Sequence, residues 1–312
     1  MRTATAPRRG HHPAAGPSPR RRPARSARPA GALLVPLLAI VGVSVLLYPV
    51  IAGWFSQLVQ VTRVDDYDVE IRELDHAERQ REIAEAHGYN ATLTGGALID
   101  PHGRTPLAQQ RDIVATYLEQ LNLGPADVMA TLRVPSAAIE LPVYHGTDDE
   151  TLLRGVGHLL GSALPVGGEG THAVLTGHRG LPESELFTNL DRVVVGDLVE
   201  VEVYGELLTY RVAEVRIVEP TDASALAPVA GRDLLSLITC TPLGINSHRI
   251  IVTAERIPNP SSDDPALTMP ALPEAPWWAP VLGAVWGGAA LYRTLLIRTA
   301  HERAARRDTV EI

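Results

Sequence analysis

The stretch Leu234-Leu-Ser-Leu-Ile-Thr-Cys240 ends in the only cysteine of the 312-residue chain. Its apolar run is typical of a buried strand, so the thiol is expected at a strand end. A lone cysteine cannot form an internal disulfide, and in an exported chain it is either a buried filler or a reactive thiol. Arg249 follows nine residues later, and His178 precedes it in the string Leu-Thr-Gly-His-Arg-Gly. These two side chains favour the reactive thiol.

Short segments with a strand-like pattern surround this run from residue 127 onward. Between Leu198 and Tyr204 valines alternate with glutamates, which predicts one apolar face and one polar face. In the longest segment the apolar phase slips between Val212 and Val215, which indicates a bulge. Strands joined by short turns, with a helical insert near 149–160, favour an all-β closed barrel rather than a parallel α/β sheet. The predicted barrel covers 127–256, with strands at 128–134, 138–144, 172–176, 198–204, 207–218, 234–239 and 250–254.

A helical region is predicted before the barrel, over residues 56–126. Charged residues dominate 61–87, which predicts one or two solvated helices that end at Gly88. A further helix is expected to begin with Thr105 as its N-cap and Pro106 at its first position, and to end at Gly124-Pro125. The glycines and the proline of residues 93–103 predict a loop between these helices.

Two apolar runs flank this folded region. Residues 31–55 carry no charge and are long enough to cross about 30 Å of hydrocarbon. They lack a convincing cleavage site, which favours a retained anchor over a cleaved signal peptide. Residues 277–297 form a second apolar run whose paired tryptophans suit a membrane interface, and a surface-lying or buried helix is its alternative. Residues 257–276 are rich in Pro, Ser and Asp and are interpreted as a linker to this second run.

The charge of the chain is divided between its ends and its middle. Residues 1–30 contain eight arginines and no acid, and residues 293–312 contain five arginines against three acids, which gives +8 and +2. The whole chain carries −8, which leaves −18 on residues 31–292. Basic flanks predict that both tails, the disordered 1–30 and 298–312, are cytoplasmic and that the acidic middle lies outside. Nucleic-acid binding by the first tail is an alternative, but a membrane topology explains its charge more simply.

Cys240, His178 and Arg249 together supply the groups for acyl transfer through a thioester. The thiolate is the nucleophile, and an imidazole can both favour it and protonate a leaving amine. A guanidinium keeps its charge near neutral pH and can stabilise the oxyanion of a tetrahedral intermediate or hold the substrate backbone. Thr239 is a weaker candidate for oxyanion support, through its backbone or its hydroxyl. No third group beside the histidine is identifiable, and this chemistry needs no cofactor and no metal.

Four further histidines lie in the predicted barrel, at His145, His158, His172 and His248. Their spacing matches no tetrahedral zinc site, so they are expected to be structural or to support the site from outside. The acidic run at 147–150 is interpreted as a loop and helix cap rather than a calcium site.

Residues 140–254 resemble a sortase catalytic domain, and specifically the class C sortases that polymerise pili. The matching strings are Leu-Pro-Val-Tyr-His-Gly at 141–146, Gly-Val-Gly-His at 155–158, Leu-Pro-Val-Gly-Gly-Glu-Gly-Thr-His at 164–172, Leu-Thr-Gly-His-Arg-Gly-Leu-Pro at 175–182 and Thr-Cys-Thr-Pro-Leu-Gly-Ile-Asn-Ser-His-Arg at 239–249. The resemblance implies an eight-stranded β-barrel, and it gives the catalytic roles to His178, Cys240 and Arg249. Two membrane spans also fit the pilus class better than the housekeeping class, which usually has one.

Class C sortases also carry an N-terminal lid with an Asp-Pro-aromatic motif. The matching positions here are Asp100, Pro101 and His102, within the predicted loop. In the family the aspartate approaches the catalytic arginine, and the aromatic ring covers the cysteine. His102 departs from the usual Phe, Trp or Tyr, and its imidazole is smaller, polar and titratable. Protonation of His102 is therefore a hypothesis for loosening the lid.

The resemblance implies a membrane-anchored cysteine transpeptidase on the outer face of a Gram-positive-type cell. Its expected substrate is a pilin or surface protein with a Leu-Pro-X-Thr-Gly-like (LPXTG-like) sorting signal, cleaved between Thr and Gly, and its expected acceptor is a pilin lysine amine. A sortase that anchors proteins to the peptidoglycan peptide would use the same three residues and differ only in the acceptor. A non-enzymatic surface module tethered by two spans is the alternative from another class. No nucleic acid is expected as a partner.

Overall fold

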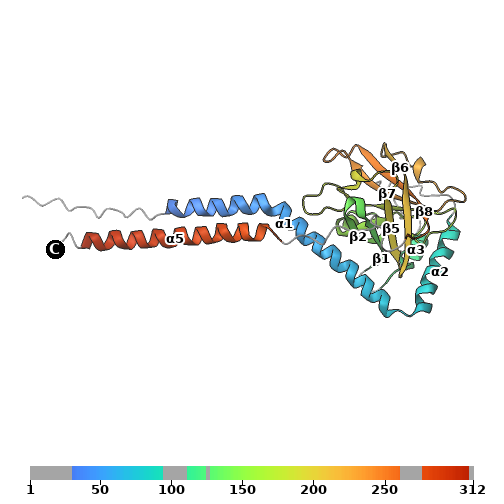
Figure 1. Cartoon of the computed structure of the whole chain (residues 1–312), viewed down its shortest axis with the longest axis horizontal. Helices are drawn as coiled ribbons and strands as arrows, with labels where there is room; N and C mark the ends of the chain where they lie inside the picture. Colours follow the sequence, from blue (N-terminus) through green and yellow to red (C-terminus); the bar gives the residue numbers. More distant parts are fainter. Residues whose placement is uncertain (1–29, 94–110, 124–126, 261–275, 309–312) are drawn as a thin grey trace, which may run out of the picture. The chain divides into compact units, whose positions relative to one another are not determined.

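The computed structural model describes residues 30–93, 111–123, 127–260 and 276–308. Within these residues eight strands close into a barrel, which confirms the predicted fold class (Figure 1). The strands are β1 Val128–Val134, β2 Ile139–His145, β3 Val156–His158, β4 His172–Thr176, β5 Leu198–Val203, β6 Glu206–Val218, β7 Leu234–Thr241 and β8 His248–Ile257. Their order around the barrel is β1-β2-β3-β4-β7-β8-β6-β5. The pairs β2/β3 and β4/β7 are parallel, and the other neighbours are antiparallel.

Alternate residues of the strands face the inside of the barrel and its outer surface. On β4, β7 and β8 the inward residues belong to the main core, and the outward residues belong to a second, smaller apolar cluster. The inward set is Ala173, Leu175, Leu235, Leu237, Ile250, Val252 and Ala254. The outward set is Val174, Ile238 and Ile251, which pack with Leu159 and Leu226.

Residues 149–160 differ from the single helical insert that the sequence predicts. Helix α4 (Asp149–Arg154) is followed at once by β3, which is too short to show a period. Glycine allows this strand to run close to its neighbour, because a Cβ on Gly157 would lie 2.3 Å from the Gly146 carbonyl oxygen. Asp148 caps α4 by accepting a hydrogen bond from the Thr151 N–H at 3.0 Å, which confirms the helix-cap interpretation. The predicted bulge is also confirmed, because the register of β6 against β8 shifts between Val212 and Glu214.

The helix that contains the predicted membrane span at 31–55 does not end with that apolar run. Helix α1 (Ala30–Glu73) is continuous over 44 residues, so the apolar run and the following charged segment form one helix. Gln60, Val64, Tyr67 and Ile71 are buried at helical spacing. This stripe packs on the barrel, and tertiary packing therefore supports helix formation where the charged sequence indicates a solvated one.

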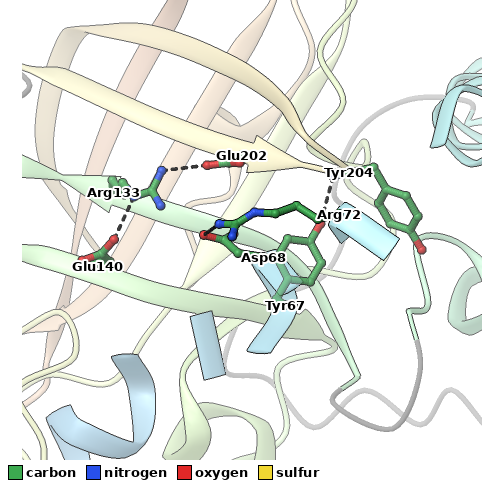
Figure 2. Close-up of polar contacts among 7 residues, drawn as sticks. All are labelled: Tyr67, Asp68, Arg72, Arg133, Glu140, Glu202 and Tyr204. Carbon is green, nitrogen blue, oxygen red and sulfur yellow. Dashed lines mark hydrogen bonds and ion pairs between the residues drawn. The ribbon is translucent and has the colours of Figure 1, made fainter. Parts of the chain in front are cut away.

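Tyr67 fastens α1 to the barrel (Figure 2). Its hydroxyl donates to the Met129 carbonyl at 3.1 Å and accepts from the Tyr204 N–H at 2.9 Å. Beside it Arg133 of β1 donates to Glu140 and to Glu202, each at 2.8 Å. These bonds satisfy polar groups that α1 covers, as burial requires.

Helix α2 (His76–Thr92) begins with a capping box and continues through Gly88 to Thr92, four residues beyond the predicted end. It continues because Tyr89 packs on the barrel core and Asn90 is anchored there. The Asn90 amide accepts from the Leu164 N–H at 2.7 Å and donates to the Leu164 carbonyl at 3.1 Å. Helix α3 covers Arg111–Glu119, and its predicted limits at Thr105-Pro106 and Gly124-Pro125 lie outside the described residues.

The chain divides into two compact units. One holds residues 43–284 and contains the barrel, and the other holds the outer parts of the two long terminal helices. The second of these, α5 (Trp278–Asp308), continues beyond the predicted end at residue 297. Both long helices contain segments long and apolar enough to cross a membrane, Leu34–Glu73 and Trp278–Glu302. They suggest membrane anchoring, as the sequence predicts.

Candidate active site

Cys240 and Arg249 lie directly opposite each other on neighbouring strands. Antiparallel β7 and β8 pair Cys240 with Arg249, one step beyond the pair Thr239 and Ile250. Residues opposite each other in a ladder place their side chains on the same face, with Cβ atoms about 4.5–5.5 Å apart. The cysteine is half-buried, and as the only cysteine of the chain it forms no internal disulfide. The nine-residue spacing in the sequence is therefore the spacing of a hairpin that turns between these two residues.

His178 follows β4, which pairs in parallel with β7. The last pair of this ladder joins Thr176 to Ile238, and the Gly177 N–H still donates to the Ile238 carbonyl at 3.1 Å. The same register, continued by two residues, places His178 beside Cys240. Residues 62 positions apart in the chain thus meet through strand pairing.

The alternation of the strands explains why all three side chains share one face. Residues an even number of positions apart in a strand share a face. Cys240 therefore shares the face of Ile238 on β7, and Arg249 shares the face of Ile251 on β8. His178, two residues after the end of β4, continues the face of Val174. Val174, Ile238 and Ile251 all belong to the outward cluster. The predicted site residues therefore gather on the outer face of the barrel, where three strands end or begin.

Two glycines shape the loop that carries His178. A Cβ on Gly177 would lie 2.9 Å from the ring of Phe187, which is fully buried. Gly180 has a φ of +75°, and a Cβ there would lie 2.4 Å from Leu243 in the β7–β8 turn. The His178 carbonyl accepts a hydrogen bond from the Phe187 N–H at 3.0 Å. These contacts fold the loop back onto the strand ends.

Electrostatics at the site favour a neutral imidazole at rest. Burial lowers the pKa of His178, and the nearby carboxylate of Asp149 in α4 acts in the opposite direction. Arg249 donates from Nη1 to the carbonyls of Asn246 and His248, each at 3.1 Å. Its Nε is buried, and no acceptor among the described residues bonds to it.

Thr239 does not offer its hydroxyl to the site. The hydroxyl is buried and donates to the Gly177 carbonyl at 2.8 Å, and Thr239 alternates with Cys240, so it faces the inner side of the ladder. The predicted oxyanion contact through this hydroxyl is not supported, while a contribution of the Thr239 backbone stays a prediction. The predicted lid residues Asp100, Pro101 and His102 lie outside the described residues.

The other histidines have structural partners. His145, His158 and His172 are buried, and each forms a hydrogen bond to a backbone carbonyl, those of Gln120, Ala163 and Ala227. His248 is exposed and bonds to Ser247. In the described part of the chain no group of three or more His, Cys, Asp or Glu side chains could hold a metal ion.

Sequence reasoning missed Arg179, the residue after the candidate base. Its side chain is only 6% exposed and forms an ion pair with Asp191 at 2.6 Å. It also donates to the Thr188 carbonyl at 3.1 Å and to the Thr241 hydroxyl at 3.0 Å. The sequence places Arg179 between His178 and a glycine, which indicates a turn but not a buried guanidinium.

Comparisons with known proteins agree with this geometry. A family model described as a sortase domain matches residues 132–257. The crystal structure of sortase C-1 from Actinomyces oris is 44% identical, with 59% of this chain and 99% of that chain covered and a TM-score of 0.54. A structure of sortase C from Streptococcus pneumoniae, described with insights into pilin substrate specificity, is 36% identical, with 62% and 96% covered and a TM-score of 0.56. Sortase D of Bacillus subtilis is 32% identical over 130 residues, which are 40% of this chain and 62% of that protein, so this chain spans less than two thirds of its length.

Proposed function

Because this chain belongs to the sortase family, whose members are cysteine transpeptidases, we propose that it is a membrane-anchored transpeptidase that joins pilins. Two observations support the proposal: Cys240 pairs directly with Arg249, and the register of β4 on β7 leads toward His178 beyond the pair Thr176 and Ile238. An LPXTG-like sorting signal is the proposed substrate, and a pilin lysine amine is the proposed acceptor.

The three side chains divide the reaction between them. The neutral His178 imidazole takes the proton of the Cys240 thiol. The thiolate attacks the carbonyl carbon of the Thr–Gly bond, and Arg249 stabilises the resulting oxyanion and holds the peptide. The C–N bond then breaks, the His178 imidazolium gives its proton to the departing glycine amine, and a thioester remains on Cys240. A lysine amine attacks the carbonyl carbon of this thioester and passes a proton to His178. The carbon–sulfur bond breaks, which releases the Cys240 thiolate and leaves an isopeptide bond between the lysine and the threonine.

Similar structures support a pilin as the acceptor. Sortases C from two organisms are among the similar structures, and one is described with respect to pilin specificity. This chain contains no lysine, so it offers no side-chain amine to its own thioester. The acceptor amine then comes from another molecule, and the acylation experiments below distinguish a pilin from a peptidoglycan peptide.

The test incubates the full chain in detergent micelles with a panel of sorting-signal peptides and analyses it by mass spectrometry. We expect an acyl adduct on Cys240 that is absent from Cys240→Ala. Arg249→Lys should slow its formation, whereas Arg211→Lys, a change at an exposed arginine of β6, should not. A folded protein that forms no adduct with any peptide, with or without the loop around Asp100, would contradict the proposal.

The acceptor is tested in the second half-reaction. A pilin fragment with a lysine should resolve the adduct faster than a peptidoglycan stem peptide does. The reverse preference would favour a wall-anchoring sortase. A Cys240→Ala chain that keeps its full function in cells would favour the non-enzymatic surface module.

The proposed topology places the barrel outside the cell and both termini in the cytoplasm. The lone cysteine makes this testable, because Cys240 is half-buried rather than sealed in the core. In intact cells a membrane-impermeant thiol reagent should label Cys240 as well as a permeant reagent of similar size. Labelling by the permeant reagent alone would place the barrel inside.

A further inference from the structure

Side-chain hydrogen bonds tie the two strand ends together on both sides of the candidate Cys–His pair. On one side the Thr239 hydroxyl donates to the Gly177 carbonyl at 2.8 Å. On the other side Arg179 Nη1 donates to the Thr241 hydroxyl at 3.0 Å. His178 and Cys240 are the residues between these two bonds. We call the two bonds together the strand-end clip.

The strand-end clip begins where the backbone ladder stops. The last backbone bond between the two segments runs from the Gly177 N–H to the Ile238 carbonyl, and β4 ends at Thr176. Beyond it, Arg179 donates to the Thr241 hydroxyl and so joins the His178 segment to the Cys240 segment.

Arg179 is built as a rigid part of the fold. Its guanidinium is nearly buried and bonds three different groups: the Thr241 hydroxyl, the Thr188 carbonyl and the Asp191 carboxylate. The planar fork of arginine fixes the directions of its donors, so three partners define its position closely. The charge is paired with Asp191 rather than directed toward a substrate.

The strand-end clip lies behind the reacting groups. Thr239 and Thr241 alternate with Cys240 along β7, so their side chains face the opposite side of the ladder. Thr241 is 9% exposed and Thr239 is fully buried. Neither hydroxyl is therefore placed to touch a peptide that approaches the thiol.

We propose that Arg179, acting through Thr241, is a positioning residue that holds His178 in register with Cys240 for the transpeptidation proposed above. This inference rests on the proposed function and adds a residue to it. Displacement of catalytic groups by about 1 Å can cost about 100-fold in rate, so a bond that fixes the imidazole opposite the sulfur has a large effect on turnover. Loss of the Arg179–Thr241 bond should change substrate affinity little, because other contacts bind the peptide.

The experiment uses the full chain in micelles and four variants. Thr241→Val removes the acceptor while it keeps the shape and every charge, Arg179→Met removes the guanidinium, Arg179→Lys keeps the charge, and the fourth combines Thr241→Val with Arg179→Met. Thr209→Val and Arg256→Met are the matched controls. Thr209 is a buried threonine with no hydroxyl partner among the described residues, and Arg256 is a partly buried arginine bonded to two carbonyls.

Two readouts are measured for each protein. The first is the rate and the peptide-concentration dependence of Cys240 acylation. The second is the rate of Cys240 alkylation by iodoacetamide as a function of pH, which reports on the imidazole beside the sulfur and needs no substrate. Near-UV circular dichroism verifies that each variant is folded.

We expect Thr241→Val and Arg179→Met to lower the maximal acylation rate at least about tenfold, with the half-saturating peptide concentration changed by less than about twofold. Their alkylation profiles should move toward that of His178→Asn, and the double variant should be no worse than Arg179→Met alone, because both remove the same bond. Arg179→Lys should recover part of the rate.

Wild-type acylation rates and alkylation profiles in folded Thr241→Val and Arg179→Met would overturn the inference. Equal losses in Thr209→Val and Arg256→Met would also overturn it, because they would show a general packing effect. If the unmodified chain forms no thioester with any peptide, the proposed function fails, and the alkylation profiles alone then decide whether the strand-end clip holds His178 beside Cys240.

Discussion

His158, the last residue of β3, is fully buried, and its hydrogen bonds suit a neutral ring. Nε2 donates to the Ala163 carbonyl at 2.8 Å, which leaves Nδ1 to accept from the Tyr117 hydroxyl at 2.9 Å. Burial lowers the pKa of His158 from 6.5 to about 4. In the unfolded chain the ring takes up a proton as the pH falls through about 6.5, whereas in the folded chain it stays neutral until about pH 4.

The unfolded state therefore binds more protons in this window, and the free energy of unfolding falls as the pH falls through it. The full difference between pKa values of 6.5 and about 4 corresponds to about 3 kcal/mol. By pH 5 the loss from His158 amounts to about 2 kcal/mol. Burial also lowers the pKa values of His145, His172 and His178, so the whole barrel should lose stability in acid.

The assay compares the melting temperature of the full chain with that of His158→Gln at pH 8 and at pH 5. Near-UV circular dichroism of the buried tyrosines is the suitable signal, because the four tryptophans lie in or beside α1 and α5. Between pH 8 and pH 5 the melting temperature should fall about 4–8 °C further in the unmodified chain than in His158→Gln, which corresponds to a difference of about 2 kcal/mol. Exposed His76 provides the control, and His76→Gln should behave like the unmodified chain. The same acid-induced decrease in His158→Gln as in the unmodified chain would refute the reasoning.

Gly177→Ala should lower stability by about 1–3 kcal/mol and slow Cys240 acylation, because the new methyl group meets the Phe187 ring at 2.9 Å. Gly88→Ala is the matched control, since its Cβ meets nothing within 4 Å inside α2, and it should raise stability by up to about 1 kcal/mol. Thermal melts and acylation rates check both, and a neutral Gly177→Ala would contradict the packing argument. Tyr67→Phe should cost about 1–3 kcal/mol, because it leaves the Tyr204 N–H and the Met129 carbonyl buried without their partner. Unchanged urea unfolding of Tyr67→Phe would show that α1 is not fastened to the barrel at this point.

Much of the barrel is predictable because strand signals are local. Alternation along residues 198–203 and the apolar run at 234–240 depend on residues two positions apart, and β5 and β7 form there. β3 escapes prediction because a strand of three residues, with a glycine in the middle, is too short to show a period. The extension of α1 beyond the apolar run depends on burial of Gln60, Val64, Tyr67 and Ile71 against strands more than 50 residues away, and no local signal reports that contact.

The residue types by themselves determined the chemistry: one thiol at a strand end, a histidine between glycines, and an arginine across a hairpin. Alternation within each strand also determined which face each of these side chains takes. Only the tertiary structure decided that β4 runs parallel to β7 in the register that joins Thr176 to Ile238, which brings His178 beside Cys240. It also decided that Arg179 turns inward to Thr241. Pairing between strands and burial of a guanidinium depend on groups far apart in the chain, so they exist only once the barrel has closed.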